Sequence, residues 1–319
     1  MRLLVTGGAG FIGSHLCESL VQGQHRTVCL DDFNDYYHPL IKRNNIRGLL
    51  QNPRFRLIEA DILDEVKLDA LFSEESFDTV VHLAARAGVR PSIQDPKLYQ
   101  RVNIEGSLKI LEACVRHRVR KIVLASSSSV YGSNAKVPFS EEDPVDHPVS
   151  PYAATKKACE LIAYTYHHLH GIAATCLRFF TVYGPRQRPD MAIHRFTRNI
   201  LEGRPISVFG DGSSRRDYTY IMDIIQGLLK SIEFCRDYHI YNLGESNTVT
   251  LADLIRMIEQ AAGKKAVIER MADQPGDVPI TYADISRARK ELGYAPSVSI
   301  DKGIVEFVRW FKENRGTGS

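Results

Sequence analysis

The feature that most constrains this chain is a glycine-rich turn near its start. Gly7, Gly10 and Gly13 follow G-x-x-G-x-x-G spacing between an apolar run and a segment with helical periodicity. In such a turn the first two glycines permit a tight bend and a close approach to pyrophosphate, the third lets a helix pack against the strand, and the helix N-terminus faces the phosphates. The turn therefore predicts a strand–turn–helix unit that binds a dinucleotide.

An acidic residue about 20 positions after the glycines completes this fingerprint. Asp31 follows the apolar run Val28-Cys29-Leu30, so it ends the expected second strand. At that place a carboxylate can accept both hydroxyls of an adenosine ribose, and it repels a 2′-phosphate. The sequence therefore favours NAD over NADP. The alternative is a Gly-rich turn without a ligand.

Short apolar runs alternate with helical stretches, which is the pattern of a parallel sheet. The expected strands are residues 3–6, 27–30, 55–59, 79–83, 121–125, 174–179 and 240–243. Helical periodicity covers residues 14–21, 98–115, 151–169, 251–262 and 300–312. We predict an α/β fold with a doubly wound parallel (Rossmann) sheet and a smaller α/β substrate-binding domain.

The length of 319 residues exceeds that of a usual single domain. Because the strand at 240–243 returns to the sheet late, the two domains are expected to interleave. We place an NAD-binding domain at residues 1–178 plus 217–243. The substrate domain then takes residues 179–216 plus 244–319.

Charge and cysteine usage restrict the partners and the compartment. The net charge is only +3 and the basic residues are scattered, so no nucleic acid or membrane partner is expected. Six cysteines lie far apart without a C-x-x-C pair, which is typical of buried thiols in a reducing compartment. The first expected strand begins near residue 2, and no apolar run is long enough to span a membrane. We expect a cytoplasmic protein.

A second constellation joins a serine run to a helix. Ser127 lies within four serines after an apolar strand, and Tyr152 and Lys156 lie one turn apart near the start of a long helix. The Lys156 ammonium can lower the pKa of the Tyr152 phenol, ordinarily about 10, and can also bind the nicotinamide ribose. Tyr152 then becomes a usable base, with Ser127 as its proton relay. The alternatives are a polar loop and an ordinary surface pair.

Together these residues resemble the extended short-chain dehydrogenases/reductases, and within them the NAD-dependent nucleotide-sugar epimerases and dehydratases. The resemblance covers nearly the whole chain. Its motifs are residues 6–13, 61–62, 82–85, 126–132, Tyr152 with Lys156, 178–185, 208–212 and 216–218.

This resemblance implies two sets of contacts and no metal. The expected NAD contacts are Gly7, Gly10, Phe11, Ile12, Gly13, Asp31, Asp61, Ile62, Leu83, Ala84, Ala85, Asn103, Tyr152 and Lys156. The expected substrate contacts are Ser127, Ser128, Thr181, Arg188, Val208, Phe209, Arg216 and Asp277. Among these, Phe209 is expected at the uracil, Arg216 at the diphosphate and Asp277 at the nucleotide ribose. The family also forms homodimers through the helix that carries Tyr152.

The serine run also indicates the reaction. Related 4,6-dehydratases carry Asp-Glu where Ser128 and Ser129 stand, and related decarboxylases carry glutamate at the second place. Epimerases need neither carboxylate. In them the C4 hydroxyl loses its proton, hydride passes to NAD, the 4-keto sugar rotates, and hydride returns to the other face. NAD is regenerated in every turnover and can stay bound.

The sugar is indicated by Thr181, where many neutral-hexose epimerases have asparagine, and by residues 185–192, which are similar to those of epimerases acting on UDP-glucuronate. Arg188 can hold a carboxylate with two parallel hydrogen bonds, and Thr181 and Ser128 can add hydroxyl donors. We therefore expect an isomerase that converts UDP-glucuronate to UDP-galacturonate. The alternatives are a UDP-glucose 4-epimerase or a UDP-N-acetylglucosamine 4-epimerase, which the modest size of Thr281 allows. A UDP-glucuronate decarboxylase and a non-catalytic NAD sensor fit the residues less well.

Overall fold

The computed structural model describes residues 1–272 and 278–314. Its larger part is a seven-stranded parallel sheet in the order β11-β6-β5-β4-β1-β2-β3. The strands are β1 (Arg2–Thr6), β2 (Arg26–Asp31), β3 (Phe55–Glu59), β4 (Thr79–His82), β5 (Lys121–Ser127), β6 (Ala173–Phe179) and β11 (Tyr238–Leu243). All seven were expected from the apolar runs, and the predicted Rossmann fold is confirmed.

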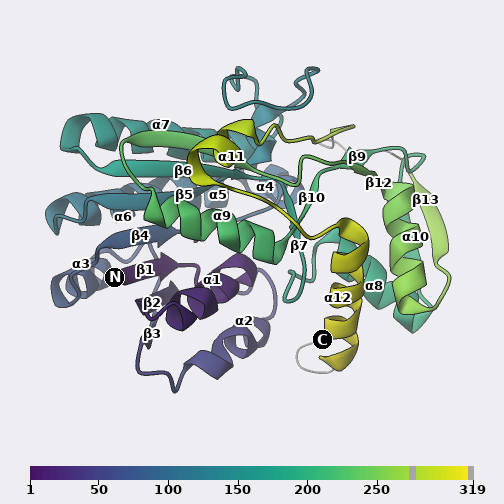
Figure 1. Ribbon diagram of the computed structural model, residues 1–319, viewed down its shortest axis with the longest axis horizontal. Helices are drawn as coiled ribbons and strands as arrows, with labels where there is room; N and C mark the ends of the chain where they lie inside the picture. The colour runs from purple at the N-terminus through teal and green to yellow at the C-terminus, as the bar shows by residue number, and fades with distance from the viewer. Residues whose placement is uncertain (273–277, 315–319) are drawn as a thin grey trace.

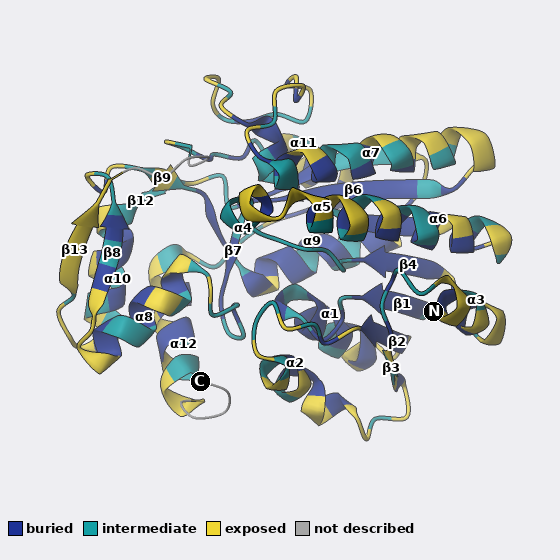
Figure 2. Cartoon of the chain, turned by 180° about the vertical axis from the view of Figure 1, so that it is seen from behind, coloured by how far each residue is buried: buried dark blue, intermediate teal, exposed yellow. Residues whose placement is uncertain are grey.

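Helices cover both faces of this sheet (Figures 1 and 2). One face carries α1 (Phe11–Gln22), α2 (Pro39–Ile46) and α9 (Ile221–Glu233), and the other carries α3 (Glu65–Glu74), α4 (Val89–Gln94), α5 (Pro96–Tyr99), α6 (Gly106–Arg116) and α7 (Pro151–His170). Leu3 and Val5 face one apolar core and Leu4 faces the other, because successive strand residues point to opposite sides. Helix α9 packs against α1, although the two are far apart in sequence.

A smaller unit lies beyond the carboxyl ends of the sheet strands (Figure 1). It contains α8 (Ala192–Glu202), α10 (Leu251–Ala262), α12 (Ile300–Glu313) and the parallel pair of β8 (Pro205–Phe209) with β13 (Val267–Met271). Two short ladders adjoin it: β7 (Thr181–Tyr183) with β10 (Tyr218–Tyr220), and β9 (Arg215–Arg216) with β12 (Val249–Thr250). Its own core gathers apolar side chains such as Ile206, Leu254 and Phe307.

The predicted domain boundaries remain a proposal. Helix α11 (Ser286–Leu292), which they assign to the substrate domain, packs against α9 and β11 of the large sheet. No helix within the described ranges is long and apolar enough to cross a membrane.

The predicted helical stretch 98–115 is helical throughout, but it is not one regular α-helix. The structure has α5, then the π-helical segment η2 (Gln100–Glu105), then α6. The wider turn coincides with Asn103, whose side chain bonds Arg86 and Thr155 in other elements. Such π segments accompany functional sites, where a side chain must be turned out of the regular helical register.

Candidate active site

A cleft at the carboxyl ends of the sheet strands brings the predicted residues together. Parallel sheets of this kind bind ligands in that place, where the strand order reverses. Of the predicted residues, the cleft is lined by Gly7, Gly10, Phe11, Ile12, Gly13, Asp31, Asp61, Ile62, Leu83, Ala84, Ala85, Ser127, Ser128, Tyr152, Lys156, Thr181 and Arg188.

The glycine turn at one end of the cleft has no room for side chains. Gly7 has φ +67°, and a Cβ atom there would lie 2.8 Å from the amide nitrogen of Ala84. At Gly13 a Cβ would lie 2.2 Å from the Gly7 oxygen. Helix α1 begins after Gly10 with neither a capping side chain nor an acidic residue in its first turn. Its N-terminal amides therefore suit an anionic group, and the turn fits the pyrophosphate of NAD.

Asp31 lies at the end of β2, where an adenosine ribose is expected. Its Oδ2 accepts the Ala9 amide at 3.1 Å, its Oδ1 accepts the Phe33 amide at 2.9 Å, and the Lys42 Nζ lies 3.8 Å from Oδ1. Burial raises the pKa of the Asp31 carboxyl, while Lys42 and the Phe33 amide act in the opposite direction. Lys42 was missed by the sequence analysis, because only the packing of α2 brings it to the cleft.

Asn103 supports the cleft wall from behind. Its Oδ1 accepts the Arg86 amide at 2.8 Å, and its Nδ2 donates to the Arg86 oxygen at 3.0 Å and to the Thr155 hydroxyl at 3.0 Å. The side chain is buried and does not line the cleft. It therefore fixes the loop after β4, which lines the cleft, to helix α7.

Tyr152, Lys156 and Ser127 form one wall of the cleft. Ser150 caps α7 by accepting the Ala153 amide at 3.1 Å, as N-capping serines do. Lys156 Nζ donates to the Ala125 oxygen of β5 at 2.8 Å and lies 6.0 Å from the centre of the Tyr152 ring. The proton-transfer groups predicted from two separate motifs thus meet at the carboxyl end of β5.

Thr181 and Arg188 also line the cleft. The Thr181 amide donates to the Asp217 oxygen at 3.0 Å, which fixes the start of β7. Arg188 donates from Nε and Nη2 to the two carboxylate oxygens of Asp190 at 2.9 and 2.8 Å, and its guanidinium lies 5.4 Å from the Tyr36 ring centre. Burial opposes the charge, but the pair with Asp190 raises the pKa of Arg188. Sequence analysis did not single out Asp190 as this partner.

Three further predicted substrate residues, Val208, Phe209 and Arg216, are not among the described residues that line the cleft. Val208 is buried in the core of the smaller unit, and the centre of the Phe209 ring lies 4.5 Å from the Arg90 guanidinium carbon. Arg216 Nη1 donates to the Arg215 oxygen at 2.9 Å. Asp277 lies outside the described residues. The uracil, diphosphate and ribose roles of these residues therefore stay predictions.

Comparison with known proteins gives consistent matches. A family model described as GDP-mannose 4,6 dehydratase matches residues 4–307. UDP-glucuronate 4-epimerase 4 of Arabidopsis thaliana is 45% identical over 330 residues, which covers 98% of this chain and 75% of the plant protein. The structure of UDP-glucuronic acid 4-epimerase from Bacillus cereus, in complex with UDP-glucuronic acid and NAD, is 39% identical with a TM-score of 0.93, and the match covers 98% of this chain and 99% of that one.

A structure with a different sugar is also similar. UDP-glucose 4-epimerase from Thermotoga maritima, with UDP-glucose, is 33% identical with a TM-score of 0.89, and the match covers 98% of this chain and 99% of the other. The chain is thus similar, over nearly its whole length, to sugar-nucleotide enzymes with and without a carboxylate on the sugar.

Proposed function

Because the chain belongs to the GDP-mannose 4,6-dehydratase family, within the extended short-chain dehydrogenases/reductases, we propose that it is an NAD-dependent isomerase that interconverts UDP-glucuronate and UDP-galacturonate. The observation that carries this proposal is the composition of one cleft. The proton-transfer residues line the same cleft as Thr181 and Arg188, which suit a carboxylate.

The side chains divide the chemistry among themselves. Tyr152 takes the proton of the C4 hydroxyl, Ser127 relays it, and Lys156 stabilises the phenolate. Bound NAD supplies the hydride acceptor and donor for C4. Lys156 is held by the Ala125 oxygen, so its ammonium has a fixed place beside the Tyr152 ring.

The sugar carboxylate requires control because a 4-keto uronate is a β-keto acid. Such an acid loses carbon dioxide when its carboxylate aligns with the carbonyl π system. Arg188 meets Asp190 with its Nε–Nη2 edge, so the Nη1 side of the guanidinium is not used by this pair. Arg188, Thr181 and Ser128 together can hold the substrate carboxylate out of that alignment.

The serine run disfavours the other reactions of the family. Elimination across C5 and C6 needs an acid and a base, but Ser128 and Ser129 stand where the dehydratases carry them. The Ser129 amide donates to the Ser127 hydroxyl oxygen (Oγ) at 3.1 Å, so this turn orients the relay serine. A hydroxyl-lined turn suits the epimerase reaction, which needs no additional carboxylate.

We also propose a cytoplasmic homodimer. Helix α7 exposes Leu161, Tyr164 and Leu169, each more than half exposed, and a helix with such a face buries it favourably against a second copy. The six cysteines are all buried free thiols, which is usual in a reducing compartment. Sedimentation of the purified protein tests the dimer, and Leu161→Glu should shift it to monomer.

The proposed reaction is tested with a panel of UDP-glucuronate, UDP-glucose and UDP-N-acetylglucosamine. Proton NMR distinguishes the C4 epimers, which have equal masses, and mass spectrometry detects any decarboxylated UDP-pentose. UDP-glucuronate should be converted fastest, reversibly and without net NADH. Faster conversion of UDP-glucose would replace the uronate assignment with the neutral-hexose alternative.

A further inference from the structure

A buried ion pair lies behind the wall that carries the proton-transfer residues. Arg178 of β6 donates from Nε and Nη2 to the two carboxylate oxygens of Glu160 of α7, both at 2.9 Å, and each side chain is only 1% exposed. Removing two charges from water costs much of what their attraction returns, so such a pair is weak evidence for stability. What the pair holds in place is the more informative property.

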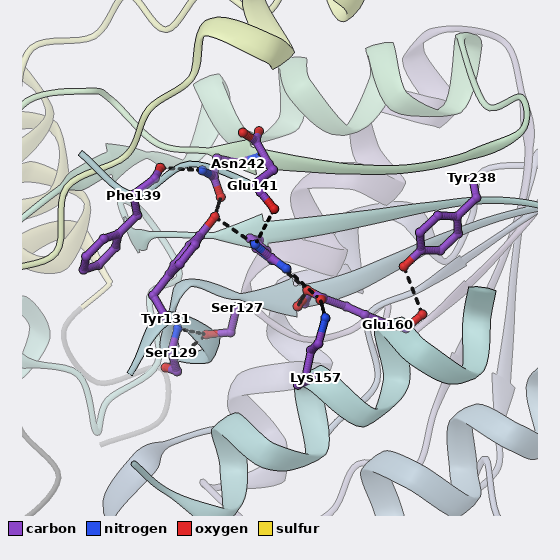
Figure 3. Close-up of polar contacts among 11 residues, drawn as sticks. Ser127, Ser129, Tyr131, Phe139, Glu141, Lys157, Glu160, Tyr238 and Asn242 are labelled. Carbon is purple, nitrogen blue, oxygen red and sulfur yellow. Dashed lines mark hydrogen bonds and ion pairs between the residues drawn. The ribbon is translucent and has the colours of Figure 1, made fainter. Parts of the chain in front are cut away.

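The pair reaches the active-site strand through one hydroxyl. Ser126 Oγ donates to Glu160 Oε1 at 2.6 Å, and Ser126 directly precedes Ser127. On the other side, Arg178 Nη1 donates to the Tyr131 hydroxyl at 3.0 Å, and that hydroxyl donates to Asn242 Oδ1 at 2.7 Å (Figure 3). The carboxylate is therefore immobilised from several elements at once.

Helix α7 is fastened to β5 at two successive residues. Tyr152, Lys156 and Glu160 are spaced by four, so they share one face of the helix. Lys156 bonds the Ala125 oxygen and Glu160 bonds the Ser126 hydroxyl. Arg178 fixes Glu160 from the neighbouring strand, where it is the register partner of Ser126.

We propose that Glu160 and Arg178 are positioning residues that act through the Ser126 hydroxyl to set the separation of Ser127 from Tyr152. The proposal rests on the epimerase function proposed above, in which these two groups move the C4 proton. Proton transfer requires donor and acceptor within about 2.6–3.2 Å, and a displacement of about 1 Å at a reacting group can cost about 10²-fold in rate. The hydrogen bond between Ser126 and Glu160 holds the residue next to Ser127, so its loss should lower kcat.

The test compares two single-hydroxyl deletions around Glu160. Ser126→Ala removes the hydroxyl on the active-site side. Tyr238→Phe removes the hydroxyl that donates to the main-chain oxygen of Glu160 at 3.0 Å, on the side away from Ser127 (Figure 3). We expect Ser126→Ala to lower kcat about tenfold, with KM for UDP-glucuronate and NAD affinity within about twofold of wild type. Tyr238→Phe should leave all three within about twofold, and Tm is measured for both variants.

A normal kcat in Ser126→Ala overturns the proposal. So does a change confined to KM or NAD affinity, which would mean that Ser126 contacts a ligand. An equal loss of kcat in Tyr238→Phe would show that any disturbance of Glu160 suffices, and it also overturns the specific role of Ser126. If the wild-type protein converts UDP-glucose but not UDP-glucuronate, the proposed substrate fails, and the same kcat comparison is made with UDP-glucose.

Discussion

Two parts of the cleft are built in different ways. The cofactor end is the part expected to bind NAD, around Gly7 and Gly13, and the sugar end is the part expected to bind the sugar, around Arg188. At the cofactor end, backbone conformation decides the shape of the glycine turn: Gly7 and Gly13 leave no space for a Cβ, and α1 begins without a side-chain cap. At the sugar end, side-chain pairs decide the shape: Arg188 is held by Asp190, and both come from a loop after β7. Backbone sites select a ligand class, whereas side-chain sites can be retuned from one sugar to another without altering the fold.

The largest expected effect lies where the two ends meet. Tyr152→Phe removes the base while keeping the ring, so turnover should fall by roughly 10² or more with NAD binding nearly intact. Loss of epimerisation with an unchanged NAD affinity by calorimetry would show that the variant has lost the catalytic step and not cofactor binding. Near-normal turnover in this variant would mean that another group is the base.

A smaller effect is expected from the sugar end alone. Arg188→Ala removes a charge-assisted contact, which should weaken use of UDP-glucuronate by about 2 kcal/mol and leave UDP-glucose binding little changed. Some UDP-pentose should also appear, because the carboxylate is freer to align for decarboxylation. Measurement of kcat/KM and products for both sugars checks this, and equal losses for the two would contradict the carboxylate role.

The cofactor end alone is probed by the choice of nucleotide. The Asp31 carboxylate repels a 2′-phosphate, so NAD should bind at least about tenfold more tightly than NADP, or about 1.4 kcal/mol. The Lys42 ammonium lies 3.8 Å from the Asp31 carboxylate. Asp31→Asn removes the carboxylate charge and leaves this ammonium unopposed, so the difference between the affinities for NAD and NADP should become smaller. Calorimetry showing equal affinities in the wild-type protein would remove Asp31 from its assigned role.

Lowering the pH should change the stability of the folded state in opposite directions at the two ends. Burial lowers the pKa of His82, at the end of β4, to about 3, so the folded state loses stability there as pH falls below 6.5. Burial raises the pKa of Asp217, whose oxygen holds Thr181, to about 6, so stability is gained there as pH falls from 6 towards 4. Between pH 7 and 5 each effect is on the order of 1 to 2 kcal/mol.

These opposite stability changes can be checked by hydrogen exchange, corrected for intrinsic rates. The peptides to follow cover residues 79–85 and 214–220. Protection should fall at the first peptide and rise at the second when the pH is lowered from 7 to 5. His82→Gln keeps a polar side chain between Thr6 and Ser107, and should abolish only the first change. A loss of protection at both peptides would contradict the assignment for Asp217.

The same division explains what could be predicted from the sequence. The sheet strands were predictable because both faces of β1 are buried, which requires a continuous apolar run. The glycine turn was predictable because the positive φ of Gly7 and the contact of Gly13 with Gly7 involve only residues close in sequence. Lys42 could not be found in this way, because its relation to Asp31 depends on how α2 packs.

The contacts at the sugar end depend on loop conformation in the same manner. Arg186 takes φ +65°, and this turn lies just before the segment in which Arg188 meets Asp190. Asn103 was expected to support the cofactor, but its π-helical setting follows from bonds to distant elements. Local requirements can be read from the chain, whereas pairings created by packing cannot.

Because α1 packs against α9, the apolar face of α1 can be covered only late in protein synthesis. Helix α1 leaves the ribosome well before α9, yet Leu16 and Leu20 share an apolar core with Ile224 and Leu228, which are made some 200 residues later. Until then the nascent chain carries an uncovered apolar helix face. Chaperone binding to ribosome-bound chains should therefore decline only after residue 233 has emerged, and chains that stop earlier should aggregate.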